Sequence, residues 1–188
     1  MSGARAILMD RDGTLIEEVN YLTRPEQVRL LPGAAEALRE AQDLGWRLAV
    51  VTNQSAVARG MLTEEGLAEV HRRLADLLAE AGVKLDGIYY CPHLADAPVE
   101  AYRDDCGCRK PKPGLLLQAA RELGLDLSRS IMVGDTAKDL EAGRAAGCLT
   151  VLVLTGYGSS ELAKLEGPSP DHVVPDLADA VRWALRKA

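Results

Sequence analysis

Short apolar runs alternate along the chain with longer segments in which apolar residues recur every three or four positions. Runs of the first kind predict buried strands, and they lie at 6–9, 46–51, 87–90, 131–133, 150–154 and 172–174. Segments of the second kind predict helices, at 34–44, 64–81, 114–123, 138–146 and 177–186. The stretch 156–170 is rich in Gly, Ser and Pro and is expected to be a loop, as is the polar connection 15–31. We therefore predict an α/β fold, a doubly wound parallel sheet with helices on both faces, in a single domain over 1–188.

Polar residues cluster where three of the predicted strands end. Asp10 and Asp12 follow the first strand, Thr52 and Asn53 follow the second, and Asp135 follows the fourth. Ligands of parallel α/β sheets bind at the carboxyl ends of the strands, so we expect these side chains to share one site. Taken singly, each cluster has a simpler interpretation: an acidic turn, a strand-end turn and a helix N-cap.

Asp10 and Asp12 are spaced so that both side chains point the same way in an extended chain. Two carboxylates held close together repel each other unless a cation sits between them or one of them keeps its proton. An ionised carboxylate can attack phosphorus, and a protonated one can donate to a leaving oxygen. Phosphoryl transfer also needs hydrogen-bond donors and cations, which the Thr-Asn pair at 52–53 and an Arg-Lys pair at 109–110 would supply. On its own, the second pair would be a solvated basic pair.

The composition restricts the class of protein. The chain has 188 residues, of which 47% are hydrophobic and 27% charged, the mixture of a globular protein with a full core. Its net charge of −6, with no compensating basic cluster, argues against nucleic acid as a partner. No apolar run approaches the roughly 20 residues of a membrane helix, and the charges near the N-terminus argue against a signal peptide. We expect a cytoplasmic monomer that does not contact a membrane.

Three of the four cysteines and one histidine lie within 18 positions of a polar segment, at Cys91, His93, Cys106 and Cys108. Three thiolates and one imidazole form a complete ligand set for tetrahedral Zn²⁺, so we predict a zinc-stabilised loop over 91–108. The alternatives are buried free cysteines, a disulfide or an iron–sulfur site. Cys148 lies beside an apolar strand and is expected to be a small core residue. His71 lies off the apolar stripe of its predicted helix, so we expect it at the surface.

Four motifs, in their order along the chain, resemble the haloacid dehalogenase (HAD) superfamily of phosphotransferases. They are Asp10-Arg-Asp-Gly-Thr14, Thr52 after an apolar strand, Lys110, and Gly134-Asp135 followed by Asp139. The resemblance covers nearly the whole chain and implies a Rossmann-like HAD core. It also implies that Asp10 attacks phosphorus to form an aspartyl phosphate, and that Asp12 first protonates the leaving alcohol and later activates water.

The same resemblance implies the cofactor ligands and the rest of the catalytic set. The implied magnesium ligands are Asp10, the backbone carbonyl of Asp12, and Asp135, with Asp139 as a supporting acid. The other implied catalytic residues are Thr52, Asn53, Arg109 and Lys110.

The zinc loop narrows the resemblance to two branches of the superfamily that lack a large cap domain. Cys-Pro-His at 91–93 and Cys-Gly-Cys at 106–108, followed by Arg109-Lys-Pro, resemble phosphatases of heptose bisphosphates and of histidinol phosphate. The run Glu-Glu-Val-Asn-Tyr-Leu at 17–22 is similar to the heptose branch, whereas the histidinol branch typically has Glu-Pro-Pro there. A small phosphorylated sugar is therefore the expected partner. Thr136 departs from the pattern, since the heptose branch often has Lys at this position.

Without an inserted cap domain, the connection 15–31 and the zinc loop are expected to cover the site. The expected substrate-binding residues are Glu18, Val19, Asn20, Tyr21, Gln54 and Ser55. A second phosphate at the far end of the sugar would need a cation of its own, either Arg109 or Lys110.

A signalling domain of the receiver type is the alternative from a different class. Such domains also carry a phosphoacceptor Asp, Mg²⁺, Thr and Lys on a doubly wound sheet, but they need neither Asp12 nor a zinc loop. A stable phosphoprotein would favour the receiver interpretation, and rapid turnover would favour an enzyme.

Overall fold

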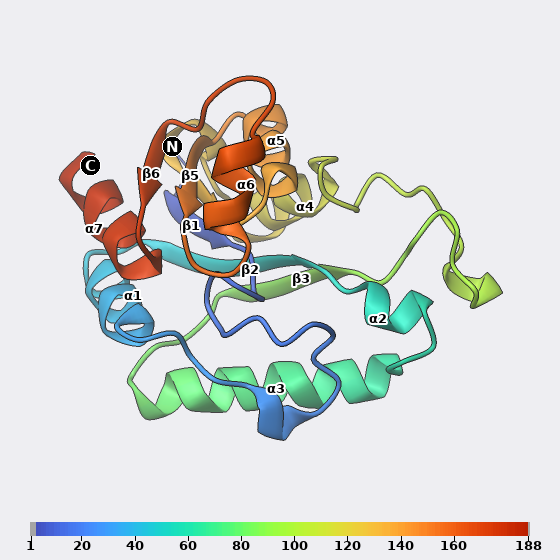
Figure 1. Cartoon of the computed structure of the whole chain (residues 1–188). Coiled ribbons are helices and arrows are strands. Elements are labelled where there is room, and N and C mark those ends of the chain that lie inside the picture. The colour runs from blue at the N-terminus through green and yellow to red at the C-terminus, as the bar shows by residue number, and fades with distance from the viewer. Residues whose placement is uncertain (1–2, 188) are drawn as a thin grey trace.

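Six strands form one sheet at the centre of the molecule (Figure 1). The structure is a computed structural model and describes residues 3–187. The strands are β1 (Ala6–Met9), β2 (Arg47–Asn53), β3 (Gly87–Cys91), β4 (Ile131–Gly134), β5 (Leu149–Val153) and β6 (His172–Val174). Their order is β3-β2-β1-β4-β5-β6, and every neighbouring pair is parallel. The predicted parallel sheet is confirmed.

Helices cover both faces of this sheet (Figure 1). They are α1 (Ala34–Asp43), α2 (Ser55–Ala58), α3 (Glu64–Glu80), α4 (Gly114–Leu123), α5 (Ala137–Ala146), α6 (Gly158–Lys164) and α7 (Leu177–Lys187), with 3₁₀ turns η1 (Pro25–Gln27), η2 (Glu100–Tyr102) and η3 (Leu127–Arg129). One core lies between the sheet and α1, α3 and α7, and it includes Ile7 and Met9 of β1. A second core lies against α4 and α5 and includes Ala6 and Leu8. Because β1 is buried on both faces, its sequence is continuously apolar rather than alternating.

The direction in which the chain builds the sheet reverses at β1. Strands β2 and β3 are added on one side of β1, and β4, β5 and β6 on the other. The carboxyl ends of β1 and β4 therefore border the crevice in which α/β proteins bind their ligands. Asp10 follows β1 and Asp135 follows β4, so the topology brings both acids to this crevice.

Two segments have more structure than the sequence predicted. The expected loop 156–170 contains α6, in which Gly158 is the one buried residue. A helix without an apolar stripe gives no periodic signal, which is why the prediction of a loop there was wrong. The connection 15–31 contains η1 and buries Leu15, Ile16, Leu22 and Val28 in the core beside α1, α3 and α7. This connection is therefore a packed part of the molecule.

The prediction that His71 lies at the surface is also wrong. Its side chain is 9% exposed, and the centre of its ring lies 5.5 Å from that of Tyr90. Turn η1 packs against α3, so the connection 15–31 covers part of a helix surface that the apolar period leaves open (Figure 1). Cys148 is buried in the core beside α4 and α5, as predicted. Within residues 3–187, no helix combines the length and the hydropathy needed to cross a membrane.

Candidate active site

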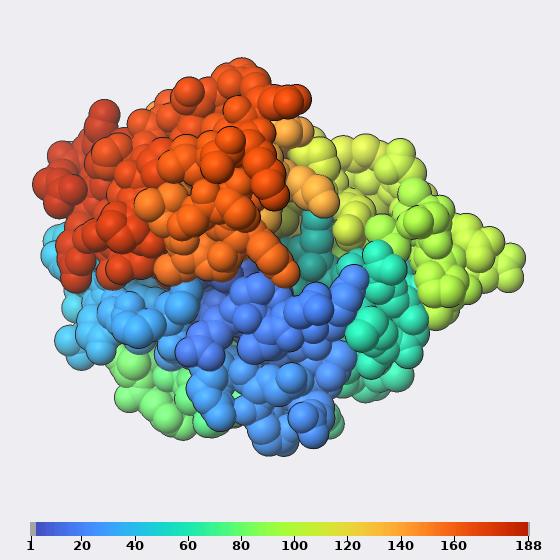
Figure 2. All heavy atoms as spheres, viewed as in Figure 1, coloured from blue at the N-terminus to red at the C-terminus, as the bar shows by residue number. Residues whose placement is uncertain are grey.

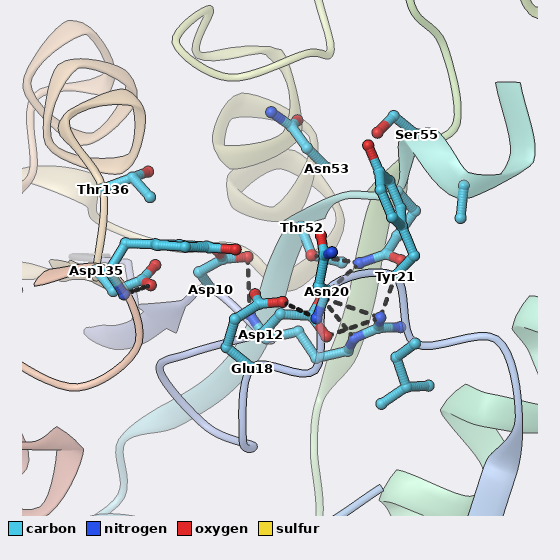
Figure 3. Close-up of a pocket in the computed structure, with 15 residues that line it drawn as sticks. Asp10, Asp12, Glu18, Asn20, Tyr21, Thr52, Asn53, Ser55, Asp135 and Thr136 are labelled. Atoms are coloured by element: carbon cyan, nitrogen blue, oxygen red, sulfur yellow. Dashed lines mark hydrogen bonds and ion pairs between the residues drawn. The ribbon is translucent and has the colours of Figure 1, made fainter. Parts of the chain in front are cut away.

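A cavity of about 250 Å³ opens at the carboxyl edge of the sheet (Figures 2 and 3). The ends of β1, β2 and β4 bring Asp10, Asp12, Thr52 and Asp135 to its wall. Its rim is supplied by the connection 15–31, the start of α2 and the segment after β5, through Glu18, Asn20, Tyr21, Ser55 and Tyr157. In Figure 2 the hollow lies between the blue and the orange parts of the chain. Residues that are far apart in the sequence thus meet at the predicted edge.

Lys110 is buried beneath the cavity and forms ion pairs with Asp10 and Asp139. Its Nζ lies 3.0 Å from Oδ1 of Asp10 and 2.6 Å from Oδ1 of Asp139, and it donates to the carbonyl of Val51 at 2.7 Å. Burial opposes the charge of this ammonium, but the two carboxylates outweigh it and raise the pKa of Lys110. With its ammonium occupied in this way, Lys110 has no free donor for a second phosphate at the far end of a sugar.

Asp10 has one occupied and one open carboxylate oxygen. Oδ1 accepts hydrogen bonds from Lys110 and from the backbone N–H of Arg11, the latter at 2.8 Å. Among residues 3–187, no group donates to Oδ2. Burial raises the pKa of Asp10 to about 6, and the charge of Lys110 opposes this rise. An oriented carboxylate with one free oxygen is suited to act as a nucleophile.

Asp135 is enclosed by backbone. Its Oδ2 accepts a hydrogen bond from the N–H of Tyr157 at 2.8 Å. Gly13 and Gly156, both with positive φ, approach its carboxylate so closely that a Cβ at either position would collide with it. Burial raises the pKa of Asp135 to about 8, and the charges of Asp10 and Asp139 add to the effect. A buried carboxylate next to other carboxylates is stable in its ionised form only if a cation neutralises the charge.

Three carboxylates are close enough to share such a cation. Oxygen atoms of Asp10, Asp135 and Asp139 lie within 4.8 Å of one another. Both oxygens of Asp139 are already occupied, Oδ1 by Lys110 and Oδ2 by the N–H and hydroxyl of Thr136 at 3.0 and 2.7 Å. Asp10 and Asp135 remain as ligands, and Mg²⁺ prefers one or two carboxylates completed by other oxygens. The donor set therefore fits magnesium.

Asp12 lies on the same wall, and its carboxylate is held by protein donors. Arg11 and Gln54 both donate to it, at distances of 2.9 to 3.1 Å. Gln54 also donates to the hydroxyl of Thr52 at 2.9 Å. The structure thus places Gln54 in the cavity wall, with its amide engaged by neighbouring side chains.

Arg109 and Val19 were also expected in the site, but neither lines the cavity. Arg109 donates from Nη1 to the carbonyl of His93 at 3.0 Å, which ties it to the zinc loop. Val19 packs against the core beside α1, α3 and α7. Its neighbours Asn20 and Tyr21 do reach the rim, and both adopt a positive φ, 49° and 67°. Residues other than glycine rarely adopt a positive φ, so the backbone at the tip of this loop is strained.

The four predicted zinc ligands lie around a common centre. The Sγ of Cys91 lies 3.3 Å from that of Cys106 and 2.9 Å from that of Cys108. The Nδ1 of His93 lies 3.9, 3.3 and 3.6 Å from the sulfurs of Cys91, Cys106 and Cys108. All three cysteines are free thiols, so the alternative of a disulfide is wrong. Three sulfurs and one nitrogen, without an oxygen ligand, fit tetrahedral zinc.

Several known proteins are similar in sequence to this chain. A family model described as HAD-hydrolase-like matches residues 107–180. A D-glycero-D-manno-heptose-1,7-bisphosphate 7-phosphatase from Thermosynechococcus vestitus is 42% identical over 184 residues, which are 95% of this chain and 94% of the relative. A D-glycero-beta-D-manno-heptose-1,7-bisphosphate 7-phosphatase from Pasteurella multocida is 43% identical, over 93% of this chain and 94% of the relative. This chain belongs to the HAD-like hydrolases.

The fold of this HAD-like hydrolase also matches a solved relative. That structure is the D,D-heptose 1,7-bisphosphate phosphatase from B. bronchiseptica, crystallised with magnesium and phosphate. It is 34% identical and superposes with a TM-score of 0.89 over 98% of this chain and 99% of the relative. The expected Rossmann-like HAD core is therefore confirmed.

Two polar residues in the cavity wall of this HAD-like hydrolase, Arg11 and Tyr157, were not expected there from the sequence. Tyr157 follows β5, and its place just after a strand end is the signal that could have found it. Arg11 stands between two acids, where sequence alone does not tell a buried arginine from an exposed one. Thr136, the departure from the heptose pattern, also lines the cavity and forms the N-cap of α5 together with Asp139.

Proposed function

We propose that this chain is a magnesium-dependent phosphatase that removes the 7-phosphate of D-glycero-D-manno-heptose 1,7-bisphosphate through a phosphoaspartate on Asp10. The observation that carries this proposal is the setting of Asp10. One of its oxygens is fixed by Lys110, the carboxylate of Asp135 lies beside it, and Asp12 is on the same wall. The names of the relatives support the substrate.

In the first step, the open oxygen of Asp10 attacks the phosphorus of the 7-phosphate. A bond forms from this oxygen to phosphorus, and the bond from phosphorus to the sugar oxygen breaks. Asp12 gives its proton to that oxygen, so the sugar leaves as an alcohol. The hydroxyl of Thr52 accepts from Gln54, which leaves its own proton to donate to the transferred phosphoryl group.

In the second step, water attacks the phosphorus of the phosphoaspartate. Asp12, now ionised, takes the proton of this water, and the bond from phosphorus to Asp10 breaks. Inorganic phosphate leaves, and both carboxyl groups return to their starting state. A receiver domain would stop after phosphorylation of Asp10, because it lacks the acid that Asp12 provides.

Mg²⁺ would be held by Asp10, Asp135 and the backbone carbonyl of Asp12. When bound, it neutralises the negative charge that gathers on the phosphoryl oxygens. The buried side chain of Lys110 adds a second positive charge, 3.0 Å from Oδ1 of Asp10. Asp139 keeps Lys110 in place, because its Oδ1 is the nearer of the two carboxylate partners.

Zn²⁺ would be held by Cys91, His93, Cys106 and Cys108. Its role here is structural, because four protein ligands leave no open position for a substrate. Arg109 directly follows Cys108, the last of these ligands, and donates a hydrogen bond to the carbonyl of His93. The metal would thus fix the position of Arg109 by fixing the loop.

The second phosphate of the substrate needs a cation at some distance from Asp10. Of the two neighbouring cations Arg109 and Lys110, Lys110 is already occupied by Asp10 and Asp139. Arg109 is the remaining candidate, with Asn20, Tyr21 and Ser55 lining the path of the sugar between the two phosphates. A single domain, a monomeric state, a cytoplasmic location and the absence of nucleic-acid partners remain predictions from the sequence.

The test is phosphate release from a small panel, with and without Mg²⁺. The panel contains both anomers of the heptose bisphosphate, fructose 1,6-bisphosphate and histidinol phosphate. We expect the largest kcat/KM on a heptose bisphosphate, and only with the metal. A preference for histidinol phosphate would refute the substrate and leave the phosphatase standing, whereas no release from any member would refute both.

A further inference from the structure

The carboxylate of Asp12 is held from two sides by Arg11 and Gln54, here called the clamp. Arg11 donates from Nε to Asp12 Oδ2 at 3.1 Å and from Nη2 to Oδ1 at 3.0 Å. Gln54 donates from Nε2 to Oδ2 at 2.9 Å. Each carboxylate oxygen has a donor, so the plane of the carboxylate is fixed.

Both residues of the clamp are buried. The side chain of Arg11 is 1% exposed and that of Gln54 is 4% exposed. A guanidinium is removed from water at a large cost in free energy unless a paired charge and hydrogen bonds compensate for it. Among residues 3–187, Asp12 is the one carboxylate paired with Arg11. The pair is therefore an integral part of the folded site, unlike a solvated surface pair.

The orientation of the Gln54 amide follows from its partners. Arg11 has donors only, so the Gln54 atom that lies 2.9 Å from its Nη2 is the oxygen. The amide nitrogen then donates to Asp12 and, also at 2.9 Å, to Thr52 Oγ1. Both N–H groups of the side chain are used by the protein, which leaves no donor for a sugar hydroxyl. The backbone N–H of Gln54 is anchored as well, on the carbonyl of Cys91 at 2.8 Å.

We propose that Arg11 and Gln54 are positioning residues for Asp12, which orient its ionised carboxylate to take the proton of the attacking water and do not bind the substrate. This inference rests on the proposed function, because it takes Asp12 as the acid and the base. Gln54 also donates to both Asp12 and Thr52. It therefore fixes the distance between the carboxylate of Asp12 and the hydroxyl of Thr52. Loss of the clamp leaves Asp12 present but free to rotate.

The two half-reactions distinguish a positioning role from contact with the substrate. The sugar leaves when the phosphoaspartate forms, so a residue that only binds the sugar has no effect on the later hydrolysis. A residue that positions Asp12 does affect the hydrolysis, because Asp12 has to take the proton of the attacking water. The lifetime of the phosphoenzyme is therefore the deciding measurement.

The experiment compares Gln54→Leu with the unaltered protein, with Asp12→Asn and with Asn20→Ala. Radiolabelled acetyl phosphate is the donor, because acetate leaves without needing a proton and the first step then bypasses Asp12. The donor is removed in the presence of Mg²⁺, and the decay of the phosphoenzyme is followed by acid quench. We expect the lifetime to lengthen by about tenfold or more in Gln54→Leu, further in Asp12→Asn, and not at all in Asn20→Ala.

The possible outcomes separate this inference from the function on which it rests. An unchanged lifetime in Gln54→Leu, beside a longer one in Asp12→Asn, would overturn the clamp and leave the phosphatase standing. No phosphoenzyme, or no longer lifetime, in Asp12→Asn would refute both. If Gln54→Leu does not fold, Gln54→Glu takes its place. Gln54→Glu keeps an acceptor for Arg11 but places a negative charge next to the carboxylate of Asp12, which repels it. We therefore expect the lifetime of the phosphoenzyme to lengthen in this variant as well.

Discussion

The side chain of Asn53 and the backbone of Lys110 are joined by two reciprocal hydrogen bonds. Asn53 Nδ2 donates to the carbonyl of Lys110, and the N–H of Lys110 donates to Asn53 Oδ1, each at 3.0 Å. These bonds attach the end of β2 to a segment that lies 57 residues further along the chain. Asn53 thus uses its amide to fix the backbone from which the Lys110 side chain reaches Asp10.

Asn53→Ala is expected to reduce activity far more than its effect on stability would explain. Two lost hydrogen bonds destabilise the fold by about 1–3 kcal/mol, but the freed backbone also displaces the ammonium of Lys110 from Asp10. We expect kcat/KM to fall by at least about tenfold. Thr63→Ala is the control, because it removes an N-cap bond to Gly66 outside the cavity lining at a cost of about 1 kcal/mol. Equal activity losses in the two variants would contradict this role of Asn53.

Asp10→Asn is expected to abolish turnover without unfolding the protein. The amide has the shape of the carboxylate but cannot form the phosphoaspartate, so a loss of about 10³-fold or more in kcat is expected. Phosphate release by the variant is measured alongside its thermal unfolding. Near-normal activity in a folded Asp10→Asn protein would end the covalent mechanism.

Much of the fold could be predicted because its strands are buried on both faces. Runs such as 6–9 and 131–133 are continuously apolar for that reason, and they locate the edge at which Asp10 and Asp135 meet. Helix α6 gave no such signal, because most of its residues are short or polar and all but Gly158 are at least partly exposed. Periodicity reports a buried face and cannot detect a helix without one.

The roles of side chains within the site were less predictable than the site itself. Lys110 and Arg109 are adjacent cations in the sequence, yet one is buried against Asp10 and the other is bonded to the zinc loop. Gln54 was expected to bind the sugar, and its amide is engaged by Arg11 and other protein groups. These differences depend on which way each side chain turns in the folded protein, which the order of residues does not specify.

Freshly purified protein is expected to hold about one equivalent of zinc. Cys106→Ala should lose this metal and unfold at a lower temperature, because metal binding at a closed four-ligand site contributes directly to folding. Cys148→Ala is the control, since this thiol is buried in the core beside α4 and α5 and is outside the cluster. Zinc content by elemental analysis and thermal unfolding are the measurements. Full zinc and full stability in Cys106→Ala would show that the loop is not a zinc site.

Arg109→Ala is expected to reduce the preference for a bisphosphate over the matching monophosphate. A charge-assisted hydrogen bond to a phosphate contributes about 1.5–3 kcal/mol, which corresponds to about 10- to 100-fold in kcat/KM on the bisphosphate. Activity on the monophosphate should change little. Lys112→Ala is the matched control, because this neighbouring cation is paired with Asp105 at 2.7 Å. An unaltered preference in Arg109→Ala would place the second phosphate elsewhere.

His71 is expected to make the stability of the protein depend on pH on the acid side of neutrality. Burial lowers its pKa from 6.5 to about 3, and the positive charge of Arg11 adds to this, while Asp12 opposes it. Between these two pH values the unfolded chain binds a proton that the folded chain does not, so stability falls as the pH falls. This contribution is complete above pH 6.5, and below it the free energy of unfolding drops by up to about 1.4 kcal/mol per pH unit. His71→Phe keeps a ring against Tyr90 but cannot titrate, so urea unfolding at pH 7 and pH 5 should differ less in this variant than in the unaltered protein. The same difference in both proteins would show that His71 is not the group responsible.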